Sequence, residues 1–120
     1  MTISNYFENK LLDTLRNQSL TIANVYLKLH LGDPGEDGTA NPAAETTRQA
    51  VTFSAASGGS MASSAAVTWT NVSTSETYTH WTAWDAASAG NCLWTGALSS
   101  QAIVTAGDTF QITSLTLTLD

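Results

Sequence analysis

Between residue 25 and the C-terminus, short segments rich in β-branched and aromatic residues alternate with turn sequences such as "SGGS" and "TAGDT". The first segment carries apolar residues at every second position: Val25, Leu27, Leu29 and Leu31. This period of two is typical of a strand with one buried face. Further strands are expected at residues 50–53, 66–69, 77–84, 92–98, 110–113 and 115–119, with a weaker pattern at 101–105. Short strands at this spacing predict an all-β fold, an antiparallel β-sandwich of jelly-roll or Ig-like type, rather than a sheet of βαβ units.

The N-terminal segment "TISNYFENKLLDTLRN" has a period near four instead. Its apolar stripe consists of Ile3, Phe7, Leu11 and Leu15, with Leu12 alongside. This spacing predicts one short α-helix, with Asn5 and Glu8 forming a capping box and Ser4 as the alternative cap. A helix of this length is marginal in water by itself, so the stripe is expected to dock on the domain or on a neighbouring subunit. Residues 1–20 are therefore expected to form a helical arm on a β-sandwich domain of residues 21–120.

Two long stretches between the expected strands differ in composition. Residues 32–45, "GDPGEDGTANPAAE", contain both prolines of the chain and four acids without a cation, so they are expected to form an exposed loop. Residues 54–64 consist almost entirely of Ala, Ser and Gly. Small residues permit close approach of backbones, so this stretch is expected to be a hairpin end lying against another chain, with a solvated loop as the alternative.

The last strands change their parity. Phe110 and Ile112 occupy one set of alternate positions, whereas Leu115, Leu117 and Leu119 occupy the other. A bulge or bend at residues 113–114 is expected, because it would return both sets to a common inward face.

The charge balance argues against several partners. The chain has four Lys and Arg residues against ten Asp and Glu, a net charge of −6, so it lacks the cationic surface that attracts nucleic acid. No apolar run approaches the roughly 18 residues of a membrane span, and the first residues lack a signal-peptide pattern. The single Cys92 cannot form an internal disulfide, which fits synthesis in a reducing cytoplasm. Neither nucleic acid nor a membrane is expected as a partner.

The acidic stretch offers the best candidate for a metal site. Asp33, Glu36 and Asp37 supply the carboxylate oxygens that Ca²⁺ prefers in flexible loops. Their spacing does not match the alternating ligands of an EF-hand. We therefore expect a solvated turn, with no metal and no cofactor.

The chain contains the ingredients of a nucleophilic triad in His30, His80, Asp85 and its many serines, but no G-x-S-x-G motif accompanies them. A triad is recognised by geometry rather than by the residue types present, and a hydrogen-bonded structural His80 is the ordinary outcome on a strand. Cys92 stands beside an apolar run, where a free cysteine is commonly a small buried residue. The chain is therefore expected to have no catalytic residues and not to be an enzyme.

Four tryptophans lie in expected strands, where large aromatic residues usually anchor the core: Trp69, Trp81, Trp84 and Trp94. Trp81 and Trp84 differ in parity, so a regular strand cannot send both to one face. One of the two is a candidate for an exposed aromatic contact, either on a sugar ring or in a pocket of a neighbouring subunit.

From Val25 onward, the segments "YLKLHLGDPGEDGTA", "RQAVTFSAASGGS", "AAVTW", "THWTAWDAASAGNCLWTGAL" and "VTAGDTFQITSLTLTLD" follow one another in an order that resembles a family of small tailed-bacteriophage virion proteins. The chain departs from the family pattern at "NPAAETTRQAVTF", which keeps Arg48 but lacks glycines. The resemblance implies an all-β structural protein of the virion, with head-decorating, minor-tail and tail-fibre-like members.

On this resemblance, the expected function is that of a capsid decoration, or cement, protein, made in the host bacterial cytoplasm and assembled into the virion. It would bind the major capsid protein and copies of itself, with a homotrimer expected because threefold sites are frequent on icosahedral shells. The expected contacts are Ile3, Phe7, Leu11 and Leu15. The alternative is a minor tail or tail-fibre component that contacts tail proteins and recognises a host surface glycan through an exposed Trp81 or Trp84.

Overall fold

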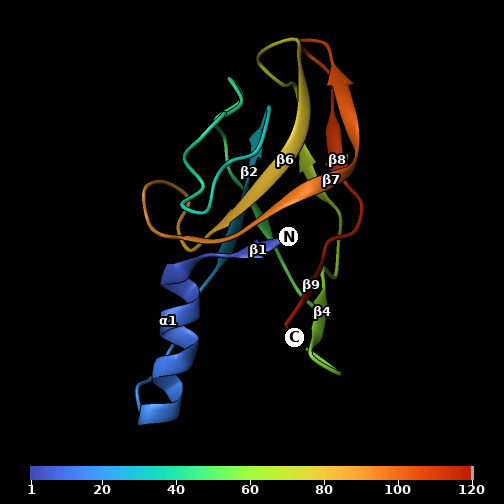
Figure 1. Ribbon diagram of the computed structural model, residues 1–120. Helices are drawn as coiled ribbons and strands as arrows, with labels where there is room; N and C mark the ends of the chain where they lie inside the picture. The colour runs from blue at the N-terminus through green and yellow to red at the C-terminus, as the bar shows by residue number, and fades with distance from the viewer. Residues whose placement is uncertain (120) are drawn as a thin grey trace.

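The computed structural model describes residues 1–119 and shows an all-β, sandwich-like protein with one short α-helix (Figure 1). A five-stranded sheet has the strand order β1-β7-β6-β2-β3, and two further ribbons pair β4 with β9 and β5 with β8, all antiparallel. The predicted fold class is therefore confirmed. In chain order the elements are β1 (Thr2–Ile3), α1 (Asn5–Asp13), the 3₁₀ turn η1 (Thr14–Arg16), β2 (Val25–His30), β3 (Gln49–Val51), β4 (Ser60–Ala62), β5 (Val67–Trp69), β6 (Glu76–Trp84), β7 (Cys92–Val104), β8 (Phe110–Ile112) and β9 (Thr116–Thr118).

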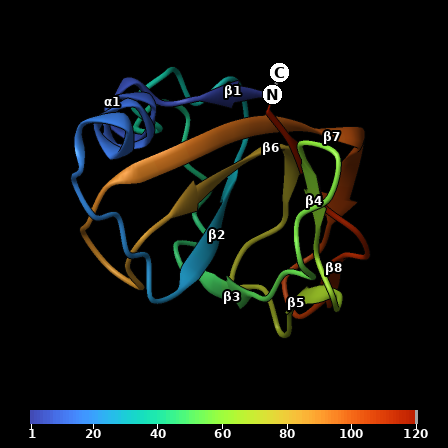
Figure 2. The same ribbon diagram turned by 90° about the horizontal axis from the view of Figure 1, so that it is seen from below.

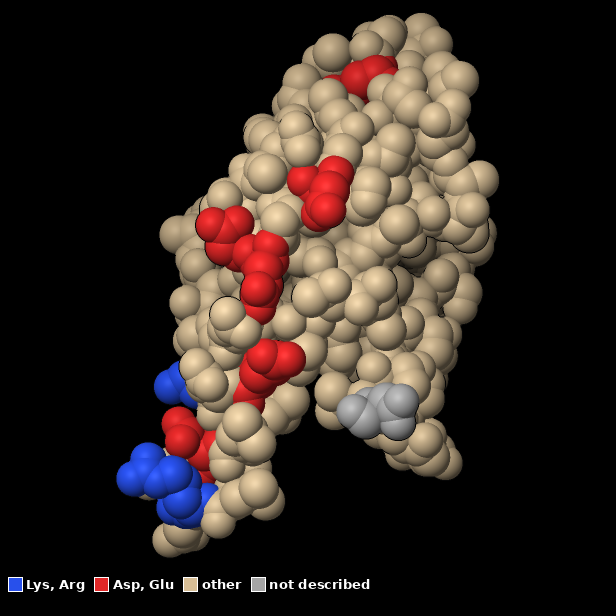
Figure 3. All heavy atoms as spheres, in the orientation of Figure 1, with Lys and Arg blue, Asp and Glu red and all other residues tan. Residues whose placement is uncertain are grey.

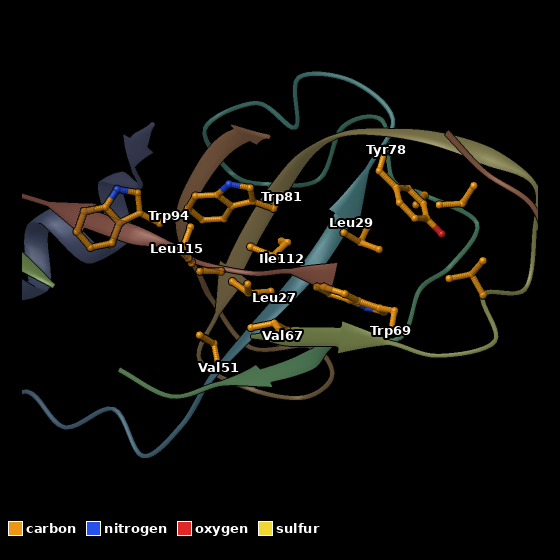
Figure 4. Close-up of a cluster of buried hydrophobic side chains, with 14 of the residues drawn as sticks. Leu27, Leu29, Val51, Val67, Trp69, Tyr78, Trp81, Trp94, Ile112 and Leu115 are labelled. Carbon is orange, nitrogen blue, oxygen red and sulfur yellow. The ribbon is translucent and has the colours of Figure 1, made fainter. Parts of the chain in front are cut away.

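The main core forms where the inward face of the five-stranded sheet meets the β5–β8 ribbon (Figure 4). Leu27 and Leu29 of β2 are fully buried there, as the alternation of that segment predicts. The Phe110 ring contacts two other aromatic rings, with centroid distances of 5.2 Å to Tyr78 and 5.8 Å to Trp69. Edge-to-face and tilted aromatic pairs add stability beyond the area that they bury. This core fixes the positions of β6 and β7. Strand β7 in turn pairs with β1 and so holds the N-terminal segment.

The opposite face of β2 and β6 is also covered, by residues 31–48. The expectation that residues 32–45 form an exposed loop is therefore wrong in part, because Pro34, Gly38, Ala43 and Glu45 are buried. Gly38 has φ +74°, and a Cβ there would lie 2.6 Å from the Cys92 sulfur, so the backbone approaches the sheet as closely as a glycine allows. The composition of this segment predicts its exposed polar residues but not the four residues that pack inward.

The N-terminal segment begins as a strand rather than as a helix. β1 pairs with β7, and the Ser4 amide donates to the Leu93 carbonyl oxygen. Ser4 is the N-cap of α1: its hydroxyl accepts from the Phe7 amide at 3.2 Å and donates to the Cys92 carbonyl oxygen at 2.6 Å. The single helix expected over residues 2–17 and the capping role of Asn5 are therefore wrong. Ser4 prevails because its hydroxyl also satisfies a buried carbonyl of the sheet. The division of the chain at residue 20 remains a prediction.

The Ala, Ser and Gly stretch folds as a hairpin that continues into a ribbon. The Ser54 amide donates to the Ala62 carbonyl oxygen, the chain turns at residues 57–60, and β4 then pairs with β9. The C-terminal segment leaves the β5–β8 ribbon after Ile112 and joins β4 from Thr116, so the expected bend coincides with a change of partner strand. Ile112, Leu115 and Leu117 all become buried by this change, whereas Leu119 stays exposed.

Candidate functional site

Two projections leave the same end of the molecule, α1 on one side and the β4–β9 ribbon on the other (Figures 1 and 2). Between them lies an apolar groove with a volume of about 250 Å³ and an adjoining hollow of about 270 Å³. Phe7, Met61, Trp94 and Leu117 line both, and among residues 1–119 no charged residue lines either. The groove is lined by Phe7, Ala56, Gly59, Ser60, Met61, Trp94, Leu117 and Leu119. An apolar, uncharged concave surface of this kind suits an apolar side chain of another molecule.

The base of α1 is held rigidly against the sheet. The Phe7 ring meets the Trp94 ring edge-on, with centroids 5.6 Å apart and planes inclined at 69°. Together with the two hydrogen bonds of the Ser4 hydroxyl, this contact fixes the direction in which the helix leaves the domain. One wall of the groove is therefore preformed.

The four predicted contact residues do not form one stripe. Ile3 lies in β1, and Ile3 and Phe7 pack against the core, whereas Leu11 is half-buried and Leu15 is 85% exposed. Leu12, which was expected alongside these residues in the stripe, is 63% exposed. Ile3 and Phe7 thus belong to the packing of the domain itself, whereas Leu15 is exposed on the surface.

The expectation that Trp81 or Trp84 is exposed is wrong, because both are buried, at 4% and 7% exposure. Trp81 faces the main core. Trp84 lies on the other face, as its parity requires, but Arg48 covers it, with the guanidinium carbon 4.1 Å from the ring centroid. Arg48 also donates to the Ala86 and Ala89 carbonyl oxygens at 2.8 and 2.7 Å. Burial lowers the pKa of Arg48, and the nearby Cys92 and Asp85 oppose that shift.

A chain of buried hydrogen bonds runs beneath residues 31–48. The Trp84 indole donates to the Thr82 hydroxyl at 2.6 Å, and that hydroxyl lies 2.9 Å from His30 Nε2. His30 Nδ1 lies 2.9 Å from the Ala40 carbonyl oxygen, which can only accept. Nδ1 therefore carries a proton, and in the neutral imidazole, which the lowered pKa of His30 favours, Nε2 accepts from the Thr82 hydroxyl. Burial lowers the pKa of His30, against the opposing effect of the Ala40 hydrogen bond.

The structure places His30 and His80 opposite each other on β2 and β6, but in the part of the chain that it describes neither imidazole hydrogen-bonds to Asp85 or to a serine. His80 Nδ1 lies 2.8 Å from the Thr79 hydroxyl, and Asp85 accepts two hydrogen bonds from Asn91. Burial raises the pKa of the Cys92 thiol to about 11, which leaves it protonated at neutral pH. His30 is engaged on both ring nitrogens, as described above.

The candidate metal ligands Asp33 and Asp37 accept hydrogen bonds from backbone and side-chain groups of their own turns. Asp33 accepts from the Gly35 amide, and Asp37 accepts from the amide and the hydroxyl of Thr39. The Thr39 hydroxyl lowers the pKa of Asp37. Within residues 1–119, no three side chains of the types that bind metals come together.

A larger polar hollow of about 590 Å³ lies on another side of the base of α1. It is lined by Ser4, Asn5, Tyr6, Glu36, Asp37, Gly90, Asn91 and Cys92. Carboxylate and amide groups beside one aromatic ring are of the types that hydrogen-bond and stack on polyhydroxylated ligands.

The charged side chains are unevenly distributed. Figure 3 shows acidic side chains along one flank and the visible cationic ones near the helical end. Lys10 and Arg16 lie in the helical segment, while Arg48 covers Trp84. The groove residues add no charge to this distribution. The helical projection also carries Glu8 and Asp13, and Asp13 lies 3.7 Å from Arg16, so its exposed leucines stand among balanced charges.

Sequence patterns predict a hairpin end over residues 54–64 but not the strand β4, which walls the groove. Ser60 and Ala62 have low strand propensity, and Met61 was the only large residue in its stretch. The alternating Leu117 and Leu119 do predict a strand, and a strand requires a partner, which the structure provides in β4.

Comparison with known proteins identifies one family. A family model described as "Podophage GP4 fiber I protein gp80" matches residues 2–120. No curated protein matches the sequence. Among the described residues, no helix is long and apolar enough to cross a membrane.

Proposed function

Because the chain belongs to the podophage fiber I protein family, whose model matches nearly its whole length, we propose that it is a structural subunit of the phage tail fibre. The observation that supports this function is the apolar, uncharged groove between α1 and the β4–β9 ribbon. A short helix and a two-stranded ribbon are each marginal alone, so both gain stability when a neighbouring molecule packs between them. The protein would act by forming interfaces.

We propose that this subunit performs no chemistry. The imidazole, carboxylate and thiol groups considered above are engaged in structural hydrogen bonds or protonated by burial, which supports a structural role. Its partners would be other proteins of the virion, and its place would be the assembled particle.

Sequence analysis predicts a decoration protein on the capsid surface. The family description favours the tail fibre instead. Copy number separates these locations, since a shell requires hundreds of copies and a tail requires tens or fewer. Quantitative mass spectrometry of purified particles, with an electron cryo-microscopy map, measures both number and place. Density at the tail with few copies is expected, and hundreds of copies on the capsid would contradict the fibre proposal.

A second candidate function is recognition of a host surface glycan. Since Trp81 and Trp84 are buried, the contact would move to the polar hollow beside Tyr6, Asn5 and Asn91. A glycan array probed with the wild-type protein and with Tyr6→Ala tests this candidate. Binding that Tyr6→Ala abolishes would support it, and an array without any bound glycan would contradict it.

A further inference from the structure

We propose that Lys28 and Arg48 form a binding site for an oxyanion, the phosphate or carboxylate group of a ligand. Strands β2 and β3 pair in a register that places Leu27 opposite Gln49, so Lys28 and Arg48 are the next two opposed residues. Directly opposed residues of an antiparallel pair project from the same face of the sheet. Neither residue lines the apolar groove, so this inference goes beyond the proposed function and does not depend on it.

The two cations are not neutralised within the protein. Like charges directly opposite each other destabilise a pair of strands. Burial lowers the pKa of Lys28, and the charge of Arg48 lowers it further. Among the residues that the structure describes, the one salt bridge joins Arg16 to Asp13, so neither Lys28 nor Arg48 is paired with a carboxylate. An anion bound between the two cations would offset their repulsion.

The Arg48 guanidinium is already oriented for such a ligand. Its Nη1 donates to the Ala86 and Ala89 carbonyl oxygens at 2.8 and 2.7 Å, and its carbon lies 4.1 Å from the centroid of the Trp84 ring. These contacts fix the plane of the guanidinium and leave the edge formed by Nε and Nη2 without a hydrogen bond to any described residue. Two N–H groups on one edge of a guanidinium match two oxygens of a phosphate or carboxylate.

The free donors of both side chains reach the surface. Lys28 and Arg48 are half-buried. Over residues 1–119, the Tyr78 hydroxyl is the one buried side-chain nitrogen or oxygen without a hydrogen-bond partner. The Lys28 ammonium and the free edge of the Arg48 guanidinium are therefore open to solvent, from which a ligand approaches. The ammonium offers three donors that rotate to meet the remaining oxygens of an oxyanion.

The local charge suits a single anionic group. Burial lowers the pKa of Arg48, and Cys92 and Asp85 oppose that shift. The Asp85 carboxylate is held by Asn91, whose amide and side chain donate to it at 2.7 and 3.0 Å. Arg48 is the charged group that acts on Lys28. Two positive charges and the negative charge of Asp85 leave a surplus of one positive charge, which one bound carboxylate or singly ionised phosphate balances.

NMR titration of the isotope-labelled, full-length protein tests the inference. Sodium phosphate and sodium glucuronate are added separately at constant pH and ionic strength, with sodium chloride as the balancing salt. Saturable shifts are expected for the Arg48 Nε–H and Trp84 indole signals. The probe that saturates identifies the group: phosphate alone, carboxylate alone, or both for a site that takes either oxyanion.

Lys28→Met removes one of the two charges and is expected to raise the dissociation constant of the saturating probe at least about tenfold, because hydrogen bonds to charged groups are strong. Lys28→Arg is expected to retain binding. Lys10→Met removes the same charge from α1 and is the matched control, expected to bind like the wild type. Far-UV circular dichroism confirms that each variant is folded.

Three results would overturn the inference. The first is a set of shifts that grow linearly with both probes or that sodium chloride reproduces. The second is an unchanged dissociation constant for Lys28→Met, and the third is equal weakening by Lys10→Met.

Discussion

The buried His30 predicts that the protein loses stability when the pH falls below about 6.5. Its pKa is lowered from 6.5 by burial, so the unfolded chain binds a proton that the native protein resists. The free energy of unfolding therefore rises with pH in this range. The stabilisation is fully present above the unfolded pKa and is lost as the pH falls toward the lowered native pKa.

The geometry explains why the native state resists the proton. Protonation at Nε2 would turn the ring nitrogen into a donor facing the Thr82 hydroxyl, which already accepts from the Trp84 indole. The Thr82 hydroxyl would then lose its own acceptor. Lys28 on the same strand and His80 opposite on β6 add positive charge that disfavours the imidazolium further.

The size of the effect follows from linkage. A histidine with an unfolded pKa of 6.5 contributes at most about 1.4 kcal/mol between pH 7.5 and pH 5.5, a limit reached when the native ring binds no proton in that range. For 120 residues this corresponds to a fall of about 5 °C in the melting temperature. Carboxylates with ordinary pKa values titrate mostly below this window.

Urea unfolding followed by tryptophan fluorescence at several pH values measures this dependence. His30→Gln keeps an amide donor and acceptor but does not titrate, so its stability is expected to change less between pH 7.5 and pH 5.5. His80→Asn removes only the neighbouring positive charge and is expected to change the slope less than His30→Gln does. Equal slopes for wild type and His30→Gln would refute the assignment of the pH dependence to this hydrogen-bond chain.

Three further predictions concern single side chains. Arg48→Ala is expected to lower the free energy of unfolding by about 2–3 kcal/mol, because it removes the stacking on Trp84 and two charged hydrogen bonds. Tryptophan fluorescence should shift to the red, and Arg48→Lys should lose less stability. An unchanged urea midpoint for Arg48→Ala would contradict a stabilising role of these contacts. Gly96→Ala is expected to cost about 1–3 kcal/mol, since a Cβ there would overlap the Trp81 indole, whereas exposed Ser99→Ala on the same strand should be nearly neutral in the same urea assay. With its pKa raised from 9.0 to about 11, the Cys92 thiol is expected to react with a disulfide reagent about a hundredfold more slowly in the native than in the urea-unfolded protein; similar rates would show that it is accessible and ionised.

The strands that alternation predicts are all present in the structure, because a face packed on a core forces the period of two, but β1 and β4 are present in addition. Leu27 and Leu29 in β2 show this directly. The helix was predicted one turn too early, since the spacing of Ile3 and Phe7 fits a helix, yet pairing with β7 takes the first residues into the sheet. Local propensity could not reveal that competition, because the partner strand lies about 90 residues away.

The groove was predictable only in its parts. Phe7 and Leu15 stood out as apolar positions of an amphipathic segment, but the sequence could not say that the first would anchor to Trp94 and the second would remain exposed. The ribbon wall was hidden because β4 consists of small residues, whose strand conformation depends on pairing with β9 and not on their own preference.

The burial of all four tryptophans bears on where the protein can make contacts. Trp81 and Trp84 point to opposite faces of β6, and the domain covers both faces itself, one with the β5–β8 ribbon and the other with residues 31–48 and Arg48. The broad faces of the five-stranded sheet are therefore already occupied around these residues. Apolar surface arranged around a concavity remains at the end where α1 and the β4–β9 ribbon project. A partner that binds by apolar contact gains most at this end, which is why disruption of assembly should follow from Leu15→Glu and not from substitutions on the exposed polar positions of the sheet.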